Sequence, residues 1–411
     1  MERSVVRVGV VLAFCACLVV SMRPGQAAPG DPVVRTVTLE EAVASAERAP
    51  EMVAARAGEQ AAEAAVHVAR ALPDPELSMA TNSINARESV SVLLPLPWPA
   101  RGPRIEAATA DLQTAGRSRD AARASARQGL RVAWFALAAA EDRAQAAGDR
   151  EGRARRNSEA IAALLAEGRV ARLEQVRADA EAALARSDRA SADEALRTAA
   201  MTLGTLMGLG PGAAVATGGG RPLPEPEGAL EESVARAREG SPEIRLELAA
   251  ADAAASRLRL ARRLRVPSLG LNLGAEFNDP TQEGTNRFVG VSVTIPIAAP
   301  AAARVALGER DRENALVERA RREAVLAAQG AWGRSRAARL RFEVIDNELL
   351  PAARQTADLT RLAYQEGKVD VFRLLDAERL LSEAAVDRAD AYEAWGAAHA
   401  DFLRSTGQDA P

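Results

Sequence analysis

The 411-residue chain contains almost none of the side chains that carry redox or metal chemistry. It has two cysteines, Cys15 and Cys17, and two histidines, His67 and His399. Because both cysteines lie close to the amino terminus, the remainder of the chain can form neither disulfides nor thiolate metal sites. Neither histidine has metal-ligating partners near it in the sequence, so we interpret both as surface residues of helices. We therefore predict no metal site and no cofactor.

The motifs of enzymes and of nucleotide-binding proteins are missing as well. The glycine-rich stretch 208–228 is not followed by the Gly-Lys-Ser/Thr sequence of a phosphate-binding loop, and the chain has no nucleophile elbow. The net charge is −3 and Lys368 is the only lysine, so the sequence has no basic tail for a polyanion. These absences predict a protein that is neither an enzyme nor a nucleic-acid binder.

Residues 1–27 have the three-part layout of a secretory signal. Two arginines provide the positive start, residues 8–20 form an apolar run, and small residues follow it, so cleavage is expected after Ala27. Lipid attachment at Cys17 is the alternative, although the apolar run continues beyond that cysteine. We expect an exported protein.

The absence of further long apolar runs restricts how this chain can meet a membrane. The run at 8–20 is shorter than the about 20 residues that a membrane-spanning helix needs, and no later stretch is apolar over that length. Charged residues instead alternate with Ala and Leu, which is typical of long helices with solvated faces. If the exported chain lies in a membrane, it must therefore do so as a closed barrel of strands.

The sequence is internally duplicated. Short motifs of the first part return in the second part in the same order, at an offset that changes only slightly. The corresponding motifs are Leu39-Glu40-Glu41 and Leu230-Glu231-Glu232, Ala133-Trp134 and Ala331-Trp332, and Gly168-Arg169-Val170 and Gly367-Lys368-Val369. We predict one repeat at 28–207, a linker rich in Gly and Pro at 208–228, and a second repeat at 229–411.

Each repeat opens with a helix and then changes to the period of a β-strand. Thr38 and Glu41 predict a capping box, and Ser241 followed by Pro242 predicts the start of the corresponding helix in the second repeat. Apolar residues then alternate with Gly, Ser, Thr and Asn. The predicted strand pairs cover 77–81 and 90–94 in the first repeat and 269–277 and 289–295 in the second.

The strands of the second repeat are long enough, at about nine or ten residues, to cross a bilayer at a tilt. Their polar sides would suit a water-filled lumen; a soluble hairpin packed on the helices is the alternative. Four strands cannot close a barrel, so several copies must associate: two would supply eight strands and three would supply twelve. Trp98 and Phe288 lie at strand margins, where a barrel places the aromatics of its membrane-interface girdle.

After its strands each repeat continues into a very long helix. Residues 107–166 and 301–365 contain a single Pro and few Gly and are dense in Ala, Leu, Glu and Arg. About sixty helical residues would span roughly 90 Å. We expect interruptions at Gly152 and Pro351, a sharp turn at a glycine after each stretch, and a second helix that returns. The predicted fold is mainly α, with long helical hairpins and four strands per chain.

The two hairpin turns carry a recognisable signature. The segments 164–173 (LLAEGRVARL) and 363–377 (AYQEGKVDVFRLLDA) resemble the repeated tip motif of TolC-like outer-membrane efflux proteins. The resemblance extends from Thr38 to Gly407. It implies a homotrimer whose twelve strands close a barrel in the outer-membrane lipid of a Gram-negative bacterium, and whose helices form an α-barrel in the periplasm.

The resemblance also implies partners. Members of this family conduct substrate passively and perform no chemistry. A periplasmic adaptor, or membrane fusion protein, docks on their helical tips and connects them with an inner-membrane pump, which for this chain is expected to be of the RND type. The candidate docking residues are Gly168, Arg169, Val170, Gly367, Lys368 and Val369.

Residues 91–104, which include the motif Leu94-Pro95-Leu96-Pro97-Trp98, resemble the branch of the family that serves heavy-metal cation pumps. Metal cations are therefore the expected cargo. Multidrug ducts and type I secretion ducts share the same frame and are the alternatives within the family. A soluble periplasmic coiled-coil scaffold or adaptor is the alternative from another class.

One departure from the family pattern concerns the tunnel entrance. Family members place acidic residues just after the second tip; Asp376 matches one such position, but Arg373 occupies the other. The corresponding residues of the first repeat are Glu174 and Arg177, so the signs are reversed between the repeats. Each pair has a spacing of three and shares one helix face. We predict a ring of cross-helix ion pairs that holds the entrance shut; the alternative is four ordinary solvated charges.

Overall fold

The computed structural model describes residues 35–82, 87–96, 98–210, 212–218, 220–277 and 284–408. The expected signal segment, with both cysteines, lies outside the described residues. Within these ranges the chain is mainly helical and has two small sheets. The mainly α class expected from the sequence is thereby confirmed.

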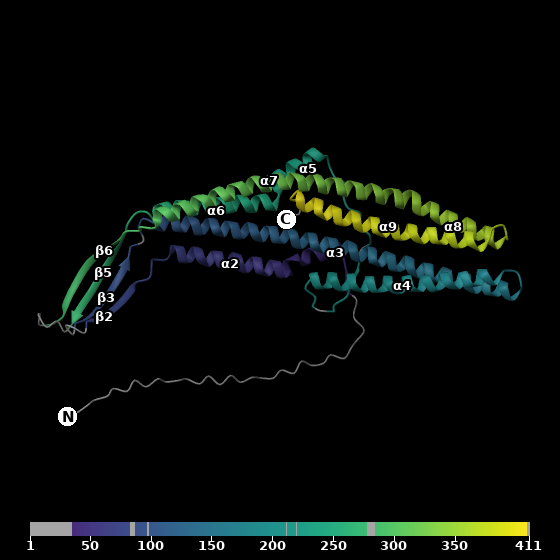
Figure 1. Cartoon of the computed structure of the whole chain (residues 1–411), viewed down its shortest axis with the longest axis horizontal. Helices are drawn as coiled ribbons and strands as arrows, with labels where there is room; N and C mark the ends of the chain where they lie inside the picture. Colours follow the sequence, from purple (N-terminus) through teal and green to yellow (C-terminus); the bar gives the residue numbers. More distant parts are fainter. Residues whose placement is uncertain are drawn as a thin grey trace, which may run out of the picture. The chain divides into compact units, whose positions relative to one another are not determined.

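The strand pairs and long hairpins follow one another in the same order in both repeats (Figure 1). The elements before the linker are β1 (Arg35–Val37), α1 (Leu39–Ala44), the 3-10 helix η1 (Ser45–Arg48), α2 (Pro50–Arg70), β2 (Glu76–Asn82), β3 (Arg87–Pro95), α3 (Arg101–Ala166) and α4 (Arg172–Leu206). The linker contains β4 (Val215–Thr217). The elements after it are α5 (Leu230–Gly240), α6 (Pro242–Arg263), β5 (Ser268–Phe277), β6 (Asn286–Thr294), α7 (Ala299–Val344), the π-helical turn η2 (Ile345–Leu349), α8 (Leu350–Gln365) and α9 (Val371–Ser405).

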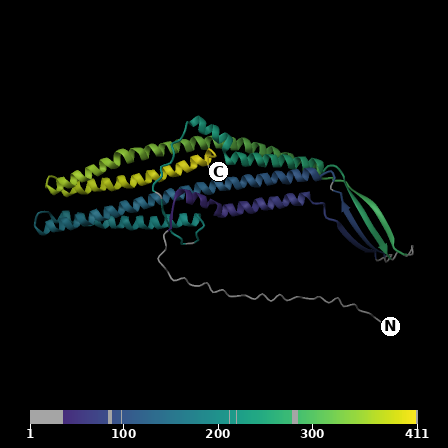
Figure 2. The ribbon, with the colours of Figure 1, turned by 180° about the vertical axis from the view of Figure 1, so that it is seen from behind.

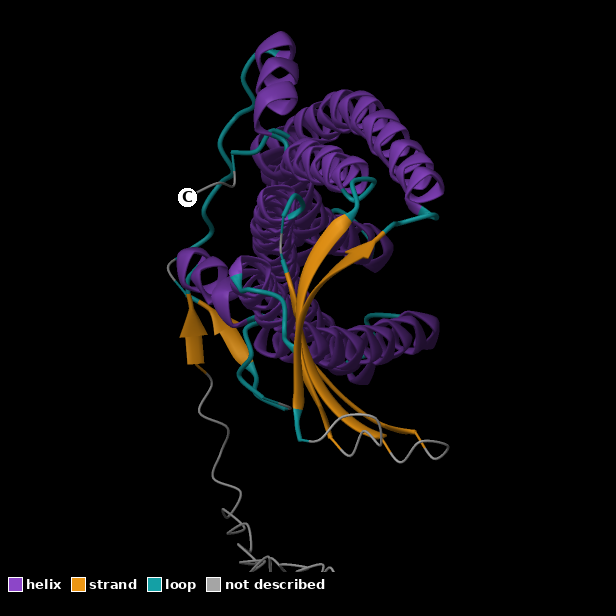
Figure 3. Cartoon of the chain, turned by 90° about the vertical axis from the view of Figure 1, so that its left-hand side faces the viewer, coloured by secondary structure: helices purple, strands orange, loops and turns teal. Residues whose placement is uncertain are grey.

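The sheet of β2, β3, β5 and β6 lies at one end of the long helices. The turns that join α3 to α4 and α8 to α9 lie at the other end, as the two opposite views agree (Figures 1 and 2). Seen from the sheet end, the small β1–β4 sheet stands apart from the four-stranded sheet (Figure 3). The duplicated sequence thus places its strands together and its hairpin turns together.

A tryptophan makes an equivalent contact in each repeat. Trp134 donates its indole N–H to the carbonyl oxygen of Val37 at 3.1 Å, and Trp332 donates to that of Gly228 at 2.9 Å. Each acceptor lies two residues before the first helix of its repeat. The duplicated Ala-Trp motif therefore ties the start of each repeat to its long helix. Trp134 is fully buried, whereas Trp332 is only half-buried.

The capping box predicted for the first repeat is confirmed. The helix start predicted for the second repeat is also confirmed, but the serine side chain there makes a different hydrogen bond. The Thr38 hydroxyl accepts from the Glu41 amide at 3.2 Å, and the Glu41 carboxylate accepts from the Thr38 amide at 3.0 Å, which completes a capping box. Ser241 occupies the N-cap of α6 with Pro242 in the first turn, as expected. Its hydroxyl, however, donates to the carboxylate of Glu243 at 2.8 Å.

The linker crosses the main apolar core instead of passing loosely between the repeats. β4 pairs in parallel with β1. Arg221 forms ion pairs with Glu141 and Asp142 of α3 at 2.9 and 2.7 Å, and the Tyr392 hydroxyl of α9 donates to the carbonyl oxygen of Pro222 at 2.9 Å. The scarce aromatic side chains gather beneath it, namely Trp134, Phe135, Phe342, Tyr392 and Trp395. The linker is therefore a strap that joins both hairpins.

The four-stranded sheet is antiparallel in the order β2-β3-β5-β6, so β2 and β6 are its open edges. The register aligns Leu77, Val92, Leu273 and Val289 across the four strands. Because side chains two positions apart share a face, most of the apolar residues of the four strands lie on one face. On the edge strands β2 and β6 its large side chains are strongly exposed, as Val289 shows with 75%, whereas Val90, Val92 and Leu94 of β3 are half-buried.

The opposite face of the sheet carries mostly Gly, Ser and Asn. One of its rows aligns Ser78, Ser91, Gly274 and Phe288. Phe288 therefore lies on the polar face, and its expected place in a lipid-facing aromatic girdle is wrong. The reason is strand phase: Val289, its neighbour in sequence, belongs to the apolar face, and consecutive side chains point to opposite faces.

The two long helices differ in continuity. α3 continues through Gly152 without an interruption, so the break expected there is wrong. A glycine lowers helix propensity but keeps its backbone N–H, so the hydrogen-bond ladder is complete. The interruption expected near Pro351 is confirmed as the π-helical turn η2, which ends before that proline. Pro351 is then the second residue of α8.

Candidate functional site at the hairpin tips

Each hairpin turn is built on a glycine in the left-handed region of backbone conformation. Gly168 has φ of 74° and Gly367 has φ of 70°. In the first turn the amide of Gly168 donates to Leu165 and that of Arg169 donates to Leu164, both at 2.9 Å. The second turn repeats this pair of hydrogen bonds. It is the Schellman arrangement, which satisfies the last helix carbonyls and requires φ > 0, so the duplicated glycine is a helix cap.

The predicted docking residues divide into an outer and an inner set. Arg169 and Lys368 are exposed, and each pairs with the glutamate two residues before it. Val170 and Val369 are half-buried, so they turn toward the helices. The glycine and the basic residue of each tip are thus the parts that face solvent.

A small apolar cluster joins the two hairpins just behind the turns. Ile161 of α3, Ala178 of α4 and Val371 of α9 are buried against one another. Tyr364, which is the next-to-last residue of α8, packs on the same cluster. All four long-hairpin helices therefore meet here, and the two tips form one packed unit.

The structure brings the four predicted gate residues to this region. Glu174 and Arg177 lie in the first turns of α4, and Arg373 and Asp376 lie in the first turns of α9. None of the four forms an ion pair within a single chain over the described ranges. The guanidinium carbon of Arg177 lies instead 3.9 Å from the ring centroid of Phe372. The predicted ring of ion pairs would therefore need charges from different copies.

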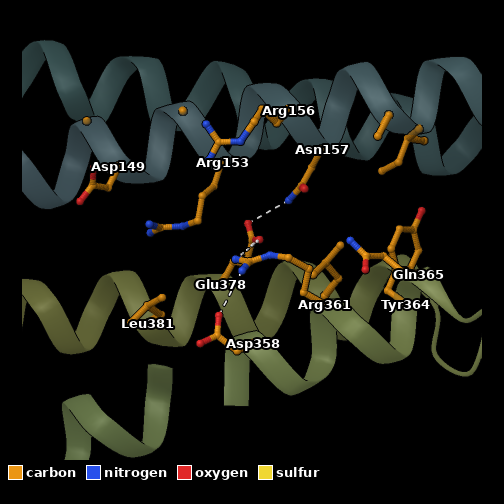
Figure 4. A pocket seen from close by; sticks show the side chains of 15 residues that line it. Asp149, Arg153, Arg156, Asn157, Asp358, Arg361, Tyr364, Gln365, Glu378 and Leu381 are labelled. Carbon is orange, nitrogen blue, oxygen red and sulfur yellow. Dashed lines mark hydrogen bonds and ion pairs between the residues drawn. The ribbon is translucent and has the colours of Figure 1, made fainter. Parts of the chain in front are cut away.

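A cleft of about 780 Å³ lies between α3 and the α8–α9 hairpin (Figure 4). Glu378 of α9 is at its centre and is only 8% exposed. Its carboxylate accepts from the side-chain amide of Asn157 of α3 at 2.8 Å and from the guanidinium of Arg361 of α8 at 3.3 Å. One buried carboxylate therefore connects the two hairpins.

Two groups that line this cleft have displaced pKa values. Burial lowers the pKa of Arg153, because desolvation disfavours the guanidinium cation; the carboxylates of Glu378 and Asp149 oppose this shift only in part. Burial raises the pKa of the Tyr364 hydroxyl, with a contribution from the carboxylate of Glu174. The cleft is thus electrostatically connected with one of the predicted gate residues.

Glu378 was not among the residues predicted from the sequence, although the spacing of apolar residues on α9 indicates that it is buried. Val371 and Leu374 are buried on α9, and Leu381 lines the cleft. Glu378 completes this stripe at spacings of three, four and three, which is the buried face of a helix. An acid at an apolar position of a helical stripe needs a partner, but the sequence does not say that the partners are Asn157 and Arg361, which lie on other helices.

The two histidines differ in their surroundings: His399 of α9 is half-buried beside the Phe402 ring, so its expected surface position is wrong. His67 is exposed on α2. Over the described ranges, no three or more His, Cys, Asp or Glu side chains converge to hold a metal ion. Among the helices that the structure describes, none combines the length and hydropathy of a membrane span.

Comparison with known proteins gives both a sequence relative and structural neighbours; no family model matches the chain. The chain is 24% identical over 364 residues to the cobalt-zinc-cadmium resistance protein CzcC of Cupriavidus metallidurans, covering 85% of each chain. Its structure is similar to that of the CmeC outer membrane channel of Campylobacter jejuni, with a TM-score of 0.75 and 15% identity over 90% of this chain and 85% of that one.

A second structural neighbour is the MtrE outer membrane channel of Neisseria gonorrhoeae in its open state, with a TM-score of 0.74 and 20% identity over 90% of this chain and 88% of that one. The chain therefore has the fold of these channels, with long helices and a small sheet. The resemblance to TolC-like outer-membrane efflux proteins, expected from the tip signature, is confirmed. The two solved structures are outer membrane channels, which agrees with the prediction that the chain is not an enzyme.

Proposed function

We propose that this chain is the outer-membrane channel of a tripartite efflux system, a homotrimer that conducts substrate passively from the periplasm to the exterior. The observation that carries the proposal is the four-stranded sheet. Both of its edges are open, and one of its faces is apolar and strongly exposed. The likeness of the whole chain to outer membrane channels supports the same assignment.

Closure of the sheet requires neighbouring copies. Unpaired strand edges are costly in lipid, so β6 of one copy would pair with β2 of the next, and three copies would close a barrel of twelve strands. Its apolar face would then contact lipid and its polar face would line the lumen. Eight strands from two copies would leave an interior that side chains fill, which is too narrow for a duct.

The long helices would form the periplasmic tunnel. α3 has 66 residues, which correspond to roughly 100 Å of helix. The exposed tip residues Gly168, Arg169, Gly367 and Lys368 would meet the periplasmic adaptor, which connects the channel to an inner-membrane pump of the RND type. Behind them, Glu174 and Arg177 of one copy would face Arg373 and Asp376 of the next and close the entrance.

Heavy-metal cations are the cargo that we propose. The support is the similarity to a protein named for cobalt, zinc and cadmium resistance, which is shared over most of both chains. Loss of the gene from its own host should then lower the metal concentration at which growth stops, and re-expression should restore it. Sensitivity to drugs without sensitivity to these metals would favour the multidrug alternative.

The channel assignment is tested by where the protein resides and how it migrates. Expressed with its own signal in a Gram-negative host, the protein should fractionate with the outer membrane. Unheated samples should migrate as a trimer on a denaturing gel and boiled samples as a monomer, because a closed barrel resists detergent. A periplasmic scaffold would remain in the soluble fraction and migrate identically in both samples, and that result would overturn the proposal.

A further inference from the structure

Two bulky apolar side chains interrupt the polar face of the sheet, and each lies over a glycine. Phe288 of β6 pairs directly with Gly274 of β5. Leu93 of β3 pairs with Asn272 and reaches Gly270, its diagonal neighbour on β5. Each of the two large side chains therefore has a glycine beneath it on the adjacent strand.

These glycine contacts are tight. A Cβ atom on Gly274 would collide with three atoms of the Phe288 ring, and one on Gly270 would lie 2.5 Å from the Ser292 hydroxyl and 2.9 Å from Cδ1 of Leu93. Both side chains thus occupy space that the Cβ atom of any residue other than glycine would need at positions 274 and 270. Phe288 is half-buried as a result, whereas Val289 on the opposite face of the same strand is 75% exposed.

We propose that Gly274 and Gly270 keep the lumen of the barrel open, because they allow Phe288 and Leu93 to lie flat against the strands. This inference rests on the proposed function, since the polar face lines a lumen only in a closed barrel. Trimer symmetry would bring three Phe288 rings to one level of the duct. A side chain at position 274 would lift all three rings toward the axis, so Gly274 is a positioning residue that sets the width of the passage.

The near absence of cysteine allows a direct test. No cysteine follows Cys17, so one introduced cysteine reports access along the lumen. Thr294→Cys lies on the polar face of β6, closer to the helices than Phe288, so a bulky charged maleimide added outside intact cells must pass the rings to reach it. In a Gly274→Ala background we expect labelling to slow by roughly tenfold, which corresponds to a barrier raised by about 1.4 kcal/mol.

Gly290→Ala is the matched control. Gly290 lies on the same face and receives the same methyl group, but a Cβ there meets nothing within 4 Å, so labelling should be unchanged. Adding Phe288→Ala to the Gly274→Ala background should restore the original rate. Equal rates in the Gly274→Ala and Gly290→Ala backgrounds would overturn the inference.

Two further variants separate failure of the inference from failure of the proposed function. Val291→Cys lies on the apolar face and should resist the charged reagent in every background. If it is labelled as fast as Thr294→Cys, no barrel exists and the channel assignment fails. If Gly274→Ala does not assemble, Phe288→Ala alone decides: a flat ring predicts little change in labelling, and a large acceleration would contradict it.

Discussion

Arg177 bears directly on how the tunnel entrance is held closed. In a single chain its guanidinium lies over the Phe372 ring and has no carboxylate partner over the described ranges. Such a cation–π contact at an exposed site contributes about 0.5–1 kcal/mol, similar to an exposed ion pair. Two kinds of contact therefore compete as the closing interaction: stacking between α4 and α9 within one copy, and ion pairs between copies.

Replacement of both Arg373 and Asp376 by Ala distinguishes these contacts. If ion pairs between copies close the entrance, the reconstituted trimer should show higher ion conductance in planar bilayers, and the gain should shrink at high salt because screening already weakens the pairs. Arg177→Gln serves as the comparison, because it removes the stacking contact with Phe372 as well as any ion pair of Arg177 with another copy. Unchanged conductance of the double variant would rule out the ion-pair ring.

Glu378 is the residue on which the cleft depends. We expect Glu378→Gln to destabilise the folded chain by ~1–3 kcal/mol, because it removes the buried anion that Arg361 and Asn157 contact and leaves Arg361 with Asp358 as its remaining carboxylate partner. Glu383→Gln is the matched control on the same helix, since its pair with Arg379 is exposed and contributes little. Denaturant midpoints would measure both; equal midpoints would contradict the structural role of Glu378.

At the scale of elements, the strands and hairpins were predictable because periodicity is local. The alternation over β5 and β6 and the glycines that end α3 and α8 each carry their own physical reason. The predictions that failed have different reasons, and only the one for the linker depended on contacts between residues far apart in the sequence. The glycine at 152 interrupts nothing because its backbone N–H completes the hydrogen-bond ladder of α3, and the linker is held against the core because Arg221 pairs with carboxylates of α3. The side of the sheet on which Phe288 lies depended on strand phase.

Replacement of a glycine by alanine should change stability in opposite directions at the left-handed hairpin turn and inside a regular helix. Gly168→Ala should weaken the tip by about 1–2 kcal/mol, because an alanine at φ of 74° is strained. Gly152→Ala should instead strengthen α3 by about 0.5–1 kcal/mol, because it replaces a flexible residue inside a regular helix. Amide hydrogen exchange at 160–175 would report the first as faster exchange, and exchange near 152 would report the second as slower. A loss of protection in both variants would show that position 152 is not regular helix.

At the scale of the whole molecule, duplication sets the number of strands and thereby the need for partners. Each repeat supplies one pair of strands, and the pairs meet side by side through β3 and β5. The sheet is consequently continuous across the two repeats but ends at β2 and β6. The same duplication gives two hairpins whose tips pack into one unit. Within a single chain the tips thus pack on each other, whereas the edges of the sheet have no partner strand over the described residues.

Cross-linking at the sheet edges tests directly whether these edges pair between copies. Cysteines at Ser78 on β2 and Ser292 on β6 lie on the same face of opposite edge strands. A short bis-maleimide should connect them between copies and produce a ladder that ends at the covalent trimer. Cysteines at Ser89 and Glu276, which are paired across β3 and β5 within one chain, should be bridged without joining copies. A ladder that ends at the dimer would mean eight strands, a barrel too narrow for the duct that we propose.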